Sequence, residues 1–279
     1  MVCSGAKTKL LIISTKEQRA RKLTPTNRLI QVNVCDKKMT ETPDEKLLGI
    51  IISNDLTWRT HLYGNNLTGD SKIVGLITKL SQRVGILSKL VKIMPQKQFA
   101  KICEGLFTSK LISCLQLFAN VWDIPSMDDL QRRSSSFTKN DNRRLQVLQS
   151  KIWRMKTGLS RETPTVELAK QTGDLSIQQL TAYHTIMTVF RVIITGKPEY
   201  LSSKLKIRNY RDEGVVPHRQ INCIEIPRSQ LTLTRSGFMY RGALLFNSLP
   251  PELRAETKIP SFKRNLRKWI VGHVKVKPT

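Results

Sequence analysis

The stretch TRSGFMYRGALLFNSLPPELRAETKIPSFKRNLRKWI, residues 234–270, carries the most specific pattern in this 279-residue chain. In its first half, Phe238, Leu245 and Leu249 fall at helical spacing and mark one apolar face. Pro250-Pro251 follows, and proline ends a helix because it lacks the N–H group and clashes with the preceding turn. We therefore predict a short helix that stops before this proline pair.

A second amphipathic helix is predicted to begin near Pro260. Its inward face would hold Phe262, Leu266 and Trp269, and its outer face Lys263, Arg264, Arg267 and Lys268. Two helices this short cannot bury their apolar faces by themselves. We predict that they form a C-terminal helical hairpin docked on a larger body.

Charge is the outlying property of the composition. The chain has 47 Lys and Arg residues against 21 Asp and Glu, a formal net charge of +26 and a pI of about 10.3. Such an excess creates a strong positive potential, and its natural counterion is a phosphate backbone. A membrane surface or an acidic protein would also suit it, and a basic face that is merely solvated needs no partner. The spread of the charge along the whole chain favours RNA and DNA as partners.

The cysteines and the apolar runs bear on location. Five cysteines, an odd number without a C-x-x-C pair, indicate reduced and buried thiols in the nucleus or cytoplasm. The apolar run at residues 10–13 is far shorter than the core of a signal peptide. The longest apolar run, residues 111–122, is interrupted by Ser113, Gln116 and Asn120, so we expect no membrane span.

The apolar period changes near residue 70 from strand-like runs to helical spacing. Runs at residues 10–13, 29–34 and 47–52 predict β-strands. We expect an α+β fold with a small N-terminal β-sheet remnant followed by a mainly α-helical bundle. The predicted divisions are a β segment at residues 1–62, a helical region at 63–196, and a basic extension with the helical hairpin at 197–279.

The helical region divides into several predicted helices. The first has an apolar face at Ile73, Leu76, Ile77, Leu80, Val84, Leu87 and Val91. The next begins at Pro95 and is apolar most of the way round to residue 118, so we expect it at the centre of a bundle. Others are predicted around residues 145–155, with Pro164 as the first residue of a helix after it, and at 175–195. The inward residues of the last would be Ile177, Leu180, Tyr183, Met187 and Phe190.

Several short motifs are more specific than their period. They are SGAKT at residues 4–8, LG at 48–49, DLTWRTH at 55–61, LQVLQSKIWRMKTG at 145–158, FMYRG at 238–242 and FNSLP at 246–250. In this order they resemble the C-terminal part of the reverse transcriptases of non-LTR retrotransposons. Ser4 and Ser150 stand where that family usually has Asn, and the Cys/His zinc knuckle that ends many relatives is missing.

The resemblance implies the end of the palm, a thumb-like region and a C-terminal extension of an RNA-directed DNA polymerase. It matches Lys7 with a palm lysine thought to protonate the leaving pyrophosphate, and an exposed lysine at a strand entry is the alternative. It places Trp58 and His61 in a block resembling a primer grip, and a packed aromatic with a histidine at a helix start is the alternative. The intact polymerase would need Mg²⁺ held by clustered aspartates. That aromatic-x-Asp-Asp motif is not in this sequence, so we expect no cofactor in the chain itself.

Nucleic-acid contacts are predicted from Trp58, His61 and the basic residues on or near the outer helix faces. The basic residues are Lys79, Arg83, Lys89, Arg143, Arg144, Lys151, Arg154, Arg264, Arg267 and Lys268. No aromatic-basic recognition motif accompanies them, so we expect phosphate contacts with little sequence preference. The palm and fingers portion of the polymerase is the implied protein partner.

Other chemistry finds little support in the sequence. The four histidines show no metal-binding spacing, and neither a G-x-S-x-G motif nor a Gly-rich phosphate loop occurs. Asp128-Asp129 fits a capping box that starts at Ser126 better than a two-metal site, so we predict no metal ligands. The rival functional interpretation is a stand-alone or domesticated nucleic-acid-binding module without polymerase activity, and a third is an inert relic.

Because the metal-binding aspartates are missing, we predict no DNA synthesis by this chain alone. Primer extension on an RNA template with Mg²⁺ should show no nucleotide incorporation above a control without protein. We also expect the coding sequence directly upstream of Met1 to supply the aromatic-x-Asp-Asp hairpin. Measurable extension by the purified chain would contradict the prediction.

Overall fold

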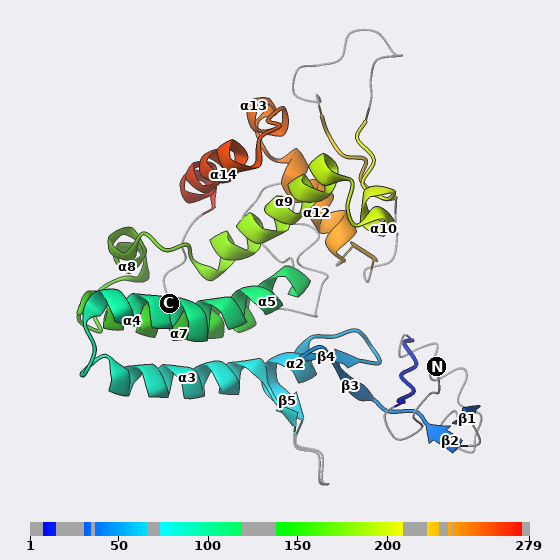
Figure 1. Cartoon of the computed structure of the whole chain (residues 1–279), viewed down its shortest axis with the longest axis horizontal. Coiled ribbons are helices and arrows are strands. Elements are labelled where there is room, and N and C mark those ends of the chain that lie inside the picture. The colour runs from blue at the N-terminus through cyan, green and yellow to red at the C-terminus, as the bar shows by residue number, and fades with distance from the viewer. Residues whose placement is uncertain are drawn as a thin grey trace. The chain divides into compact units, whose positions relative to one another are not determined.

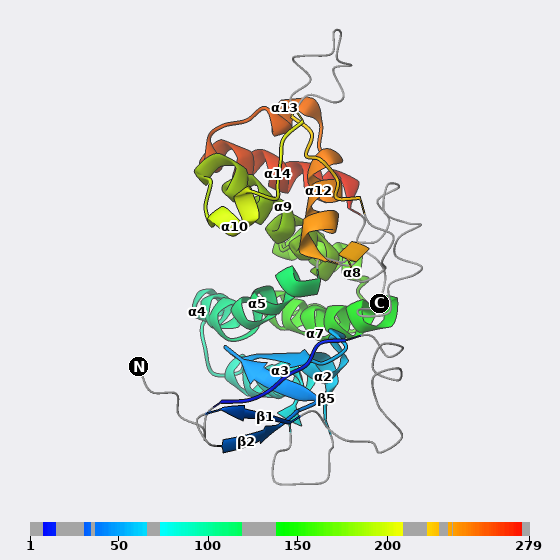
Figure 2. The ribbon, with the colours of Figure 1, turned by 90° about the vertical axis from the view of Figure 1, so that its right-hand side faces the viewer.

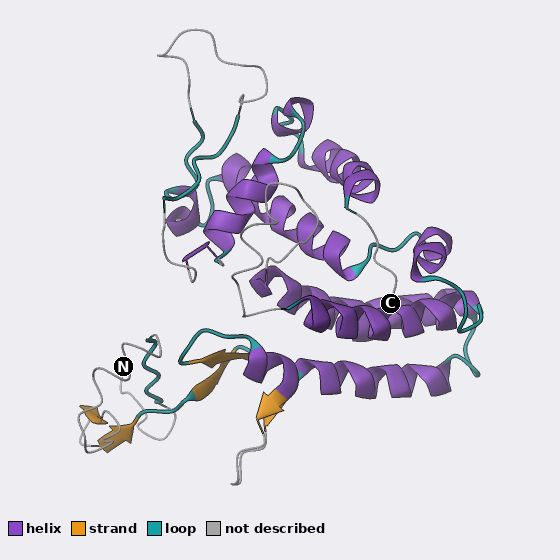
Figure 3. Cartoon of the chain, turned by 180° about the vertical axis from the view of Figure 1, so that it is seen from behind, coloured by secondary structure: helices purple, strands orange, loops and turns teal. Residues whose placement is uncertain are grey.

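Helices make up most of the structure, and the strands form short antiparallel pairs (Figure 3). The computed structural model describes residues 8–14, 31–34, 37–65, 73–118, 138–208, 222–228, 234–235 and 237–274. The chain divides into two compact units, residues 1–79 with 135–137, and residues 80–134 with 138–279. The α+β class predicted from the sequence is confirmed.

In its described residues, the first unit contains three two-stranded antiparallel sheets and helix α2 (Arg59–Tyr63). The pairs are β1 (Gln31–Val34) with β2 (Lys37–Thr40), β3 (Asp44–Leu47) with β4 (Ile50–Ser53), and β5 (Gly64–Asn65) with β6 (Ile73–Val74). Gly75 lies so close to the backbone of Tyr63 that a Cβ would come within 2.3 Å of its carbonyl carbon. Only glycine allows the chain to pass there before the next helix begins.

The strand expected at residues 47–52 is wrong, because a hairpin occupies this position. Leu48 and Gly49 form its turn, with φ angles of 50° and 86°, and Leu47 pairs with Ile50 across it. Leu48 is 96% exposed at the tip. An apolar run gives no sign that a leucine adopts the left-handed conformation, which is uncommon outside glycine.

The other two expected strands are shorter than predicted. Within residues 29–34 the described part is Gln31–Val34, which forms β1. Residues 8–14 contain one isolated parallel bridge, between Leu10 and Glu41. The Ser14 N–H also donates to the Asn54 carbonyl at 3.1 Å. This segment therefore contacts the β3–β4 region without pairing as a full strand.

The second unit is built from helices, and α3 (Leu76–Leu90) enters it at residue 80. Its other described elements are α4 (Gln96–Cys103), the π-helix η1 (Glu104–Thr108), α5 (Ser109–Phe118), α7 (Lys139–Thr157), α8 (Thr165–Thr172), α9 (Ile177–Thr195), α10 (Glu199–Ser202), α12 (Phe238–Asn247), α13 (Pro251–Arg254) and α14 (Ile259–His273). Figure 1 labels most of them. The long helices lie where the apolar period predicts them.

Helix α9 lies at the centre of this unit, and α5, α7, α12 and α14 pack on it. Its inward residues are buried as predicted: Ile177, Leu180, Tyr183, Met187 and Phe190. Ser176 caps its start, because the hydroxyl accepts from the Gln179 N–H at 3.3 Å and the Gln179 side chain accepts from the Ser176 N–H at 3.0 Å. The segment from α4 to α5 was predicted at the centre of the bundle, but one of its faces is exposed to solvent, with Leu106 37% exposed. The central helix is α9.

The two predicted C-terminal helices are α12 and α14, and both lie beside α9 in Figures 1 and 2. Phe190 of α9 stacks on Phe262 of α14, with ring centroids 3.6 Å apart and planes at 4°. The predicted outer face of α14 is exposed. Pro251 does more than follow the end of α12, because it is also the first residue of the short α13, which the sequence pattern did not predict.

Two helix starts differ from the prediction by one position. Pro95 and Pro164 are not the first helical residues but the N-caps of α4 and α8, both with extended backbone. The helices therefore begin at Gln96 and Thr165. The fixed φ of proline, near −60° at both residues, suits the N-cap as well as the first turn.

Gly242 lies where α12 approaches α9, and a Cβ there would come within 2.9 Å of Val189 Cγ2. We predict that Gly242→Ala lowers the free energy of unfolding by about 1–3 kcal/mol, because a β-branched valine cannot turn away without repacking. Gly85→Ala is the matched control, since a Cβ at this exposed helical position meets nothing within 4 Å. Urea denaturation should show the control gaining about 1 kcal/mol from helix propensity. Equal stability of the two variants would contradict the prediction.

Candidate nucleic-acid interface

Five of the predicted contact residues have exposed side chains that make no hydrogen bond or ion pair within the described part of the chain. They are Lys89 on α3, Arg143 and Lys151 on α7, and Arg264 and Lys268 on α14. Arg144, also predicted, is exposed on α7 as well. The charges of the five residues without such bonds are therefore open to an external anion.

Helix α7 presents its cations outward because its ends and one face are fixed. At its start, the Thr138 hydroxyl accepts from the Asp141 N–H at 3.2 Å, and the Asp141 carboxylate accepts from the Thr138 N–H at 2.7 Å. At its end Gly158 adopts the left-handed conformation with φ of 73°. Leu145 and Trp153 are buried on the inner face. The opposite face is left with the basic residues.

The segment that precedes α9 is fastened to α7 by polar contacts. The Gln149 side chain donates to the Leu175 carbonyl at 2.9 Å, and the Gln146 side chain accepts from the Ile177 N–H at 3.0 Å. Lys156 pairs with Asp174 at 2.8 Å. These contacts fix α7 relative to the core helix, so its outer face is a rigid surface.

Three predicted contact residues instead bind backbone carbonyl groups within the chain. Arg83 donates to the Leu106 carbonyl, Arg154 to the Ser160 and Thr163 carbonyls at 3.2 Å each, and Arg267 to the Gly173 carbonyl at 2.7 Å. Helical periodicity shows which face a residue occupies but not which carbonyl lies within reach, so these bonds could not be predicted from the sequence. A guanidinium has five N–H donors, so each arginine keeps donors for a phosphate.

The predicted contact residues of the first unit lie differently. His61 is 3% exposed, and its Nδ1 accepts a hydrogen bond from the Ile51 N–H at 3.2 Å, which ties α2 to β4. Trp58 is half-buried and meets His61 edge-on, with ring centroids 6.4 Å apart. This geometry fits the packing alternative for the pair, and a nucleic-acid contact stays a prediction. Lys79 is half-buried on α3.

The candidate catalytic group, Lys7, lies outside the described residues, as does Asp128-Asp129. Among the residues that are described, no three His, Cys, Asp or Glu side chains form a metal-binding group. Cys103 and Cys114 are buried and form no disulfide, as predicted, whereas Cys223, which also forms no disulfide, is only half-buried. Burial raises the pKa of the Cys103 thiol to about 11, so it stays protonated at neutral pH and acts as a packing residue.

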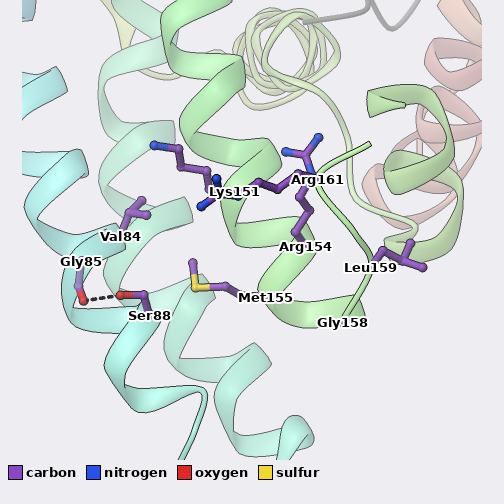
Figure 4. A pocket seen from close by; sticks show the side chains of 9 residues that line it. All are labelled: Val84, Gly85, Ser88, Lys151, Arg154, Met155, Gly158, Leu159 and Arg161. Atoms are coloured by element: carbon purple, nitrogen blue, oxygen red, sulfur yellow. Dashed lines mark hydrogen bonds between the residues drawn. The ribbon is translucent and has the colours of Figure 1, made fainter. Parts of the chain in front are cut away.

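An open pocket of about 760 Å³ lies between α3 and α7. It is lined by Val84, Gly85 and Ser88 of α3, by Lys151, Arg154 and Met155 of α7, and by Gly158, Leu159 and Arg161 of the following loop. Figure 4 shows the α3 residues across from the three basic side chains. Arg161 could not be predicted from periodicity, because it lies in a loop.

Comparison with known proteins gives no relative from which to infer a function. No family model, curated protein or solved structure matches the chain. In the described ranges, none of the helices has the length and apolar character needed to cross a membrane. Inference about function therefore starts from the residues and their geometry.

The two hydrogen bonds of Arg154 hold the loop after α7, whereas Arg143 on the same helix makes none within the described residues. We predict that Arg154→Ala lowers the free energy of unfolding by about 1–2 kcal/mol, because removal of this charged donor leaves two carbonyl groups without their hydrogen bonds. Arg143→Ala, the matched control, should stay within about 0.5 kcal/mol of the wild type. Both values follow from chemical denaturation. A loss for Arg154→Ala no larger than the loss for Arg143→Ala would contradict the structural role of the Arg154 hydrogen bonds.

Proposed function

We propose that this chain binds RNA and DNA through phosphate contacts made by the outward-facing cations of α7 and α14. The best support is that four of these cations are exposed and unpaired in the described part of the chain. Arg143 and Lys151 on α7, and Arg264 and Lys268 on α14, are exposed and make no bond within the described residues. They are held on rigid helices, so their charges are presented at fixed spacing.

A nucleic acid suits this surface better than a compact anion. Arg143 and Lys151 are separated by about 12 Å along the axis of α7, at 1.5 Å per residue. A duplex carries one negative charge per about 1.7 Å of its axis, so several phosphates lie within that length. The net charge of +26 adds a long-range attraction for the same polyanion. These contacts reach the backbone and not the base edges, so little sequence preference is expected.

The motifs shared with non-LTR reverse transcriptases give this binding a role, which belongs to the same proposal. The chain would be the C-terminal part of such a polymerase and would hold template RNA and the nascent duplex. It would be inactive alone, because the aspartates that bind Mg²⁺ are not in its sequence. The palm and fingers portion that carries them would be its protein partner.

Phosphate binding predicts a steep dependence on salt. The affinity for a fluorescent DNA duplex should fall by orders of magnitude between about 50 and 200 mM salt. The triple variant Arg143→Gln, Arg264→Gln, Lys268→Gln should reduce the slope of log K against log salt by about one for each lost contact. Fluorescence anisotropy titrations at several salt concentrations measure both quantities.

A charge-matched variant separates these residues from the general effect of net charge. Lys97→Gln, Lys101→Gln, Lys170→Gln removes the same number of charges at exposed lysines of α4 and α8, outside the predicted set. We expect its salt slope to stay close to that of the wild type. Equal salt slopes for the two triple variants would show that Arg143, Arg264 and Lys268 do not form the interface. No binding by the wild type at about 50 mM salt would reject the proposed function.

A further inference from the structure

We propose that the pocket between α3 and α7 takes one nucleotide of a single strand, with its phosphate on Lys151 and Arg161 and its base against Met155 and Leu159. This inference rests on the proposed function and goes beyond it, since it names a single strand as the ligand and a defined site for it. Different outcomes of one binding experiment would contradict the pocket inference and the proposed function.

The pocket has the size and the walls for this ligand. Its volume of about 760 Å³ lies within the range of small-molecule sites, about 300–1,000 Å³. Val84, Met155 and Leu159 supply apolar surface, and a nucleobase is a flat aromatic ring that gains by leaving water. The thioether of a methionine also makes favourable contacts with aromatic rings. Because the pocket is open, the strand can enter and leave along it.

The charged side of the pocket is prepared for a phosphate. Lys151 and Arg161 are exposed and make no hydrogen bond or ion pair within the described residues. Arg154 donates to the carbonyls of Ser160 and Thr163, which lie on either side of Arg161 in the chain. Arg154 is therefore a positioning residue that fixes the loop, and the loop carries Arg161 beside α7 (Figure 4).

Gly85 creates the room on the α3 side. A Cβ at this position would meet nothing within 4 Å, so the space beside the helix is empty. The Ser88 hydroxyl turns back to the Gly85 carbonyl at 2.8 Å and does not fill it. A base in a duplex is paired and stacked, so it cannot enter such a recess unless it leaves the stack. A duplex would therefore contact the outward-facing cations through its phosphates, Lys151 among them, without placing a base in the pocket.

The test compares the affinities of a fluorescent oligouridylate and of an RNA duplex of equal length for the full chain and its variants. Gly85→Leu fills the recess and should weaken single-strand binding roughly ten-fold, the loss expected when the base no longer buries apolar surface there. Duplex affinity should change less than about two-fold, because the outer phosphate contacts remain. Thermal unfolding followed by circular dichroism checks that the variant is folded.

Gly105→Leu is the matched control. Gly105 is also an exposed helical glycine whose Cβ would meet nothing within 4 Å, and its carbonyl also accepts a serine hydroxyl, that of Ser109. It does not line the pocket. We expect both affinities of this variant to match the wild type.

A second pair of variants decides the question if Gly85→Leu does not fold. Lys151→Gln with Arg161→Gln should weaken the single strand more than the duplex, whereas the charge-matched Lys97→Gln with Lys101→Gln should affect neither selectively. If the filled pocket lowers both affinities alike, or neither, while the wild type still binds, the pocket inference is wrong and the proposed function stands. If the wild type binds neither nucleic acid at about 50 mM salt, both fail.

Discussion

Helix α9 carries apolar side chains around most of its circumference, so it is stable only when other helices enclose it. The flat stack of Phe190 on Phe262 places α14 against it, and α12 approaches it closely at Gly242. Buried polar side chains of α9 then hydrogen-bond to the ends of neighbouring helices, since buried donors need acceptors. Gln179, for example, donates to the Val274 carbonyl at 2.8 Å just after α14. Helices α7 and α14 pack on this core with their apolar faces and turn their basic faces outward.

The scarcity of acidic residues decides how arginines stabilise the second unit. Arg154 and Arg267 bind neutral carbonyl groups, and buried Arg241 donates to the Arg235 carbonyl at 3.3 Å. Burial lowers the pKa of Arg241 to about 10, which still leaves it protonated at neutral pH. A bond to a carbonyl pairs an N–H donor of the guanidinium without cancelling its charge, unlike the ion pair of Lys156 with Asp174. The hydrogen bonds that order the fold therefore leave most of the positive charge uncompensated.

Long amphipathic helices could be predicted from the sequence because burial of one face imposes a period that residue types reveal. The inward residues of α9 and the cations of α14 follow from that period alone. The turn at Leu48 could not be predicted, because it depends on a left-handed backbone that leucine rarely adopts. The carbonyl partners of Arg154 and the pocket beside Gly85 depend on how separate helices meet. Tertiary contact, which no local pattern encodes, decides which cations hold the fold and which face a ligand.

The positive charge that would attract a polyanion in the proposed function destabilises the free folded chain. Like charges confined to one molecule repel each other, and this repulsion lowers the stability of the compact state. A bound nucleic acid removes part of it and stabilises the folded chain further by mass action. Because Arg154 already orders the loop that carries Arg161, binding there does not have to order that loop. In the proposed function, cations held on rigid helices would bind phosphates while leaving the base sequence unread.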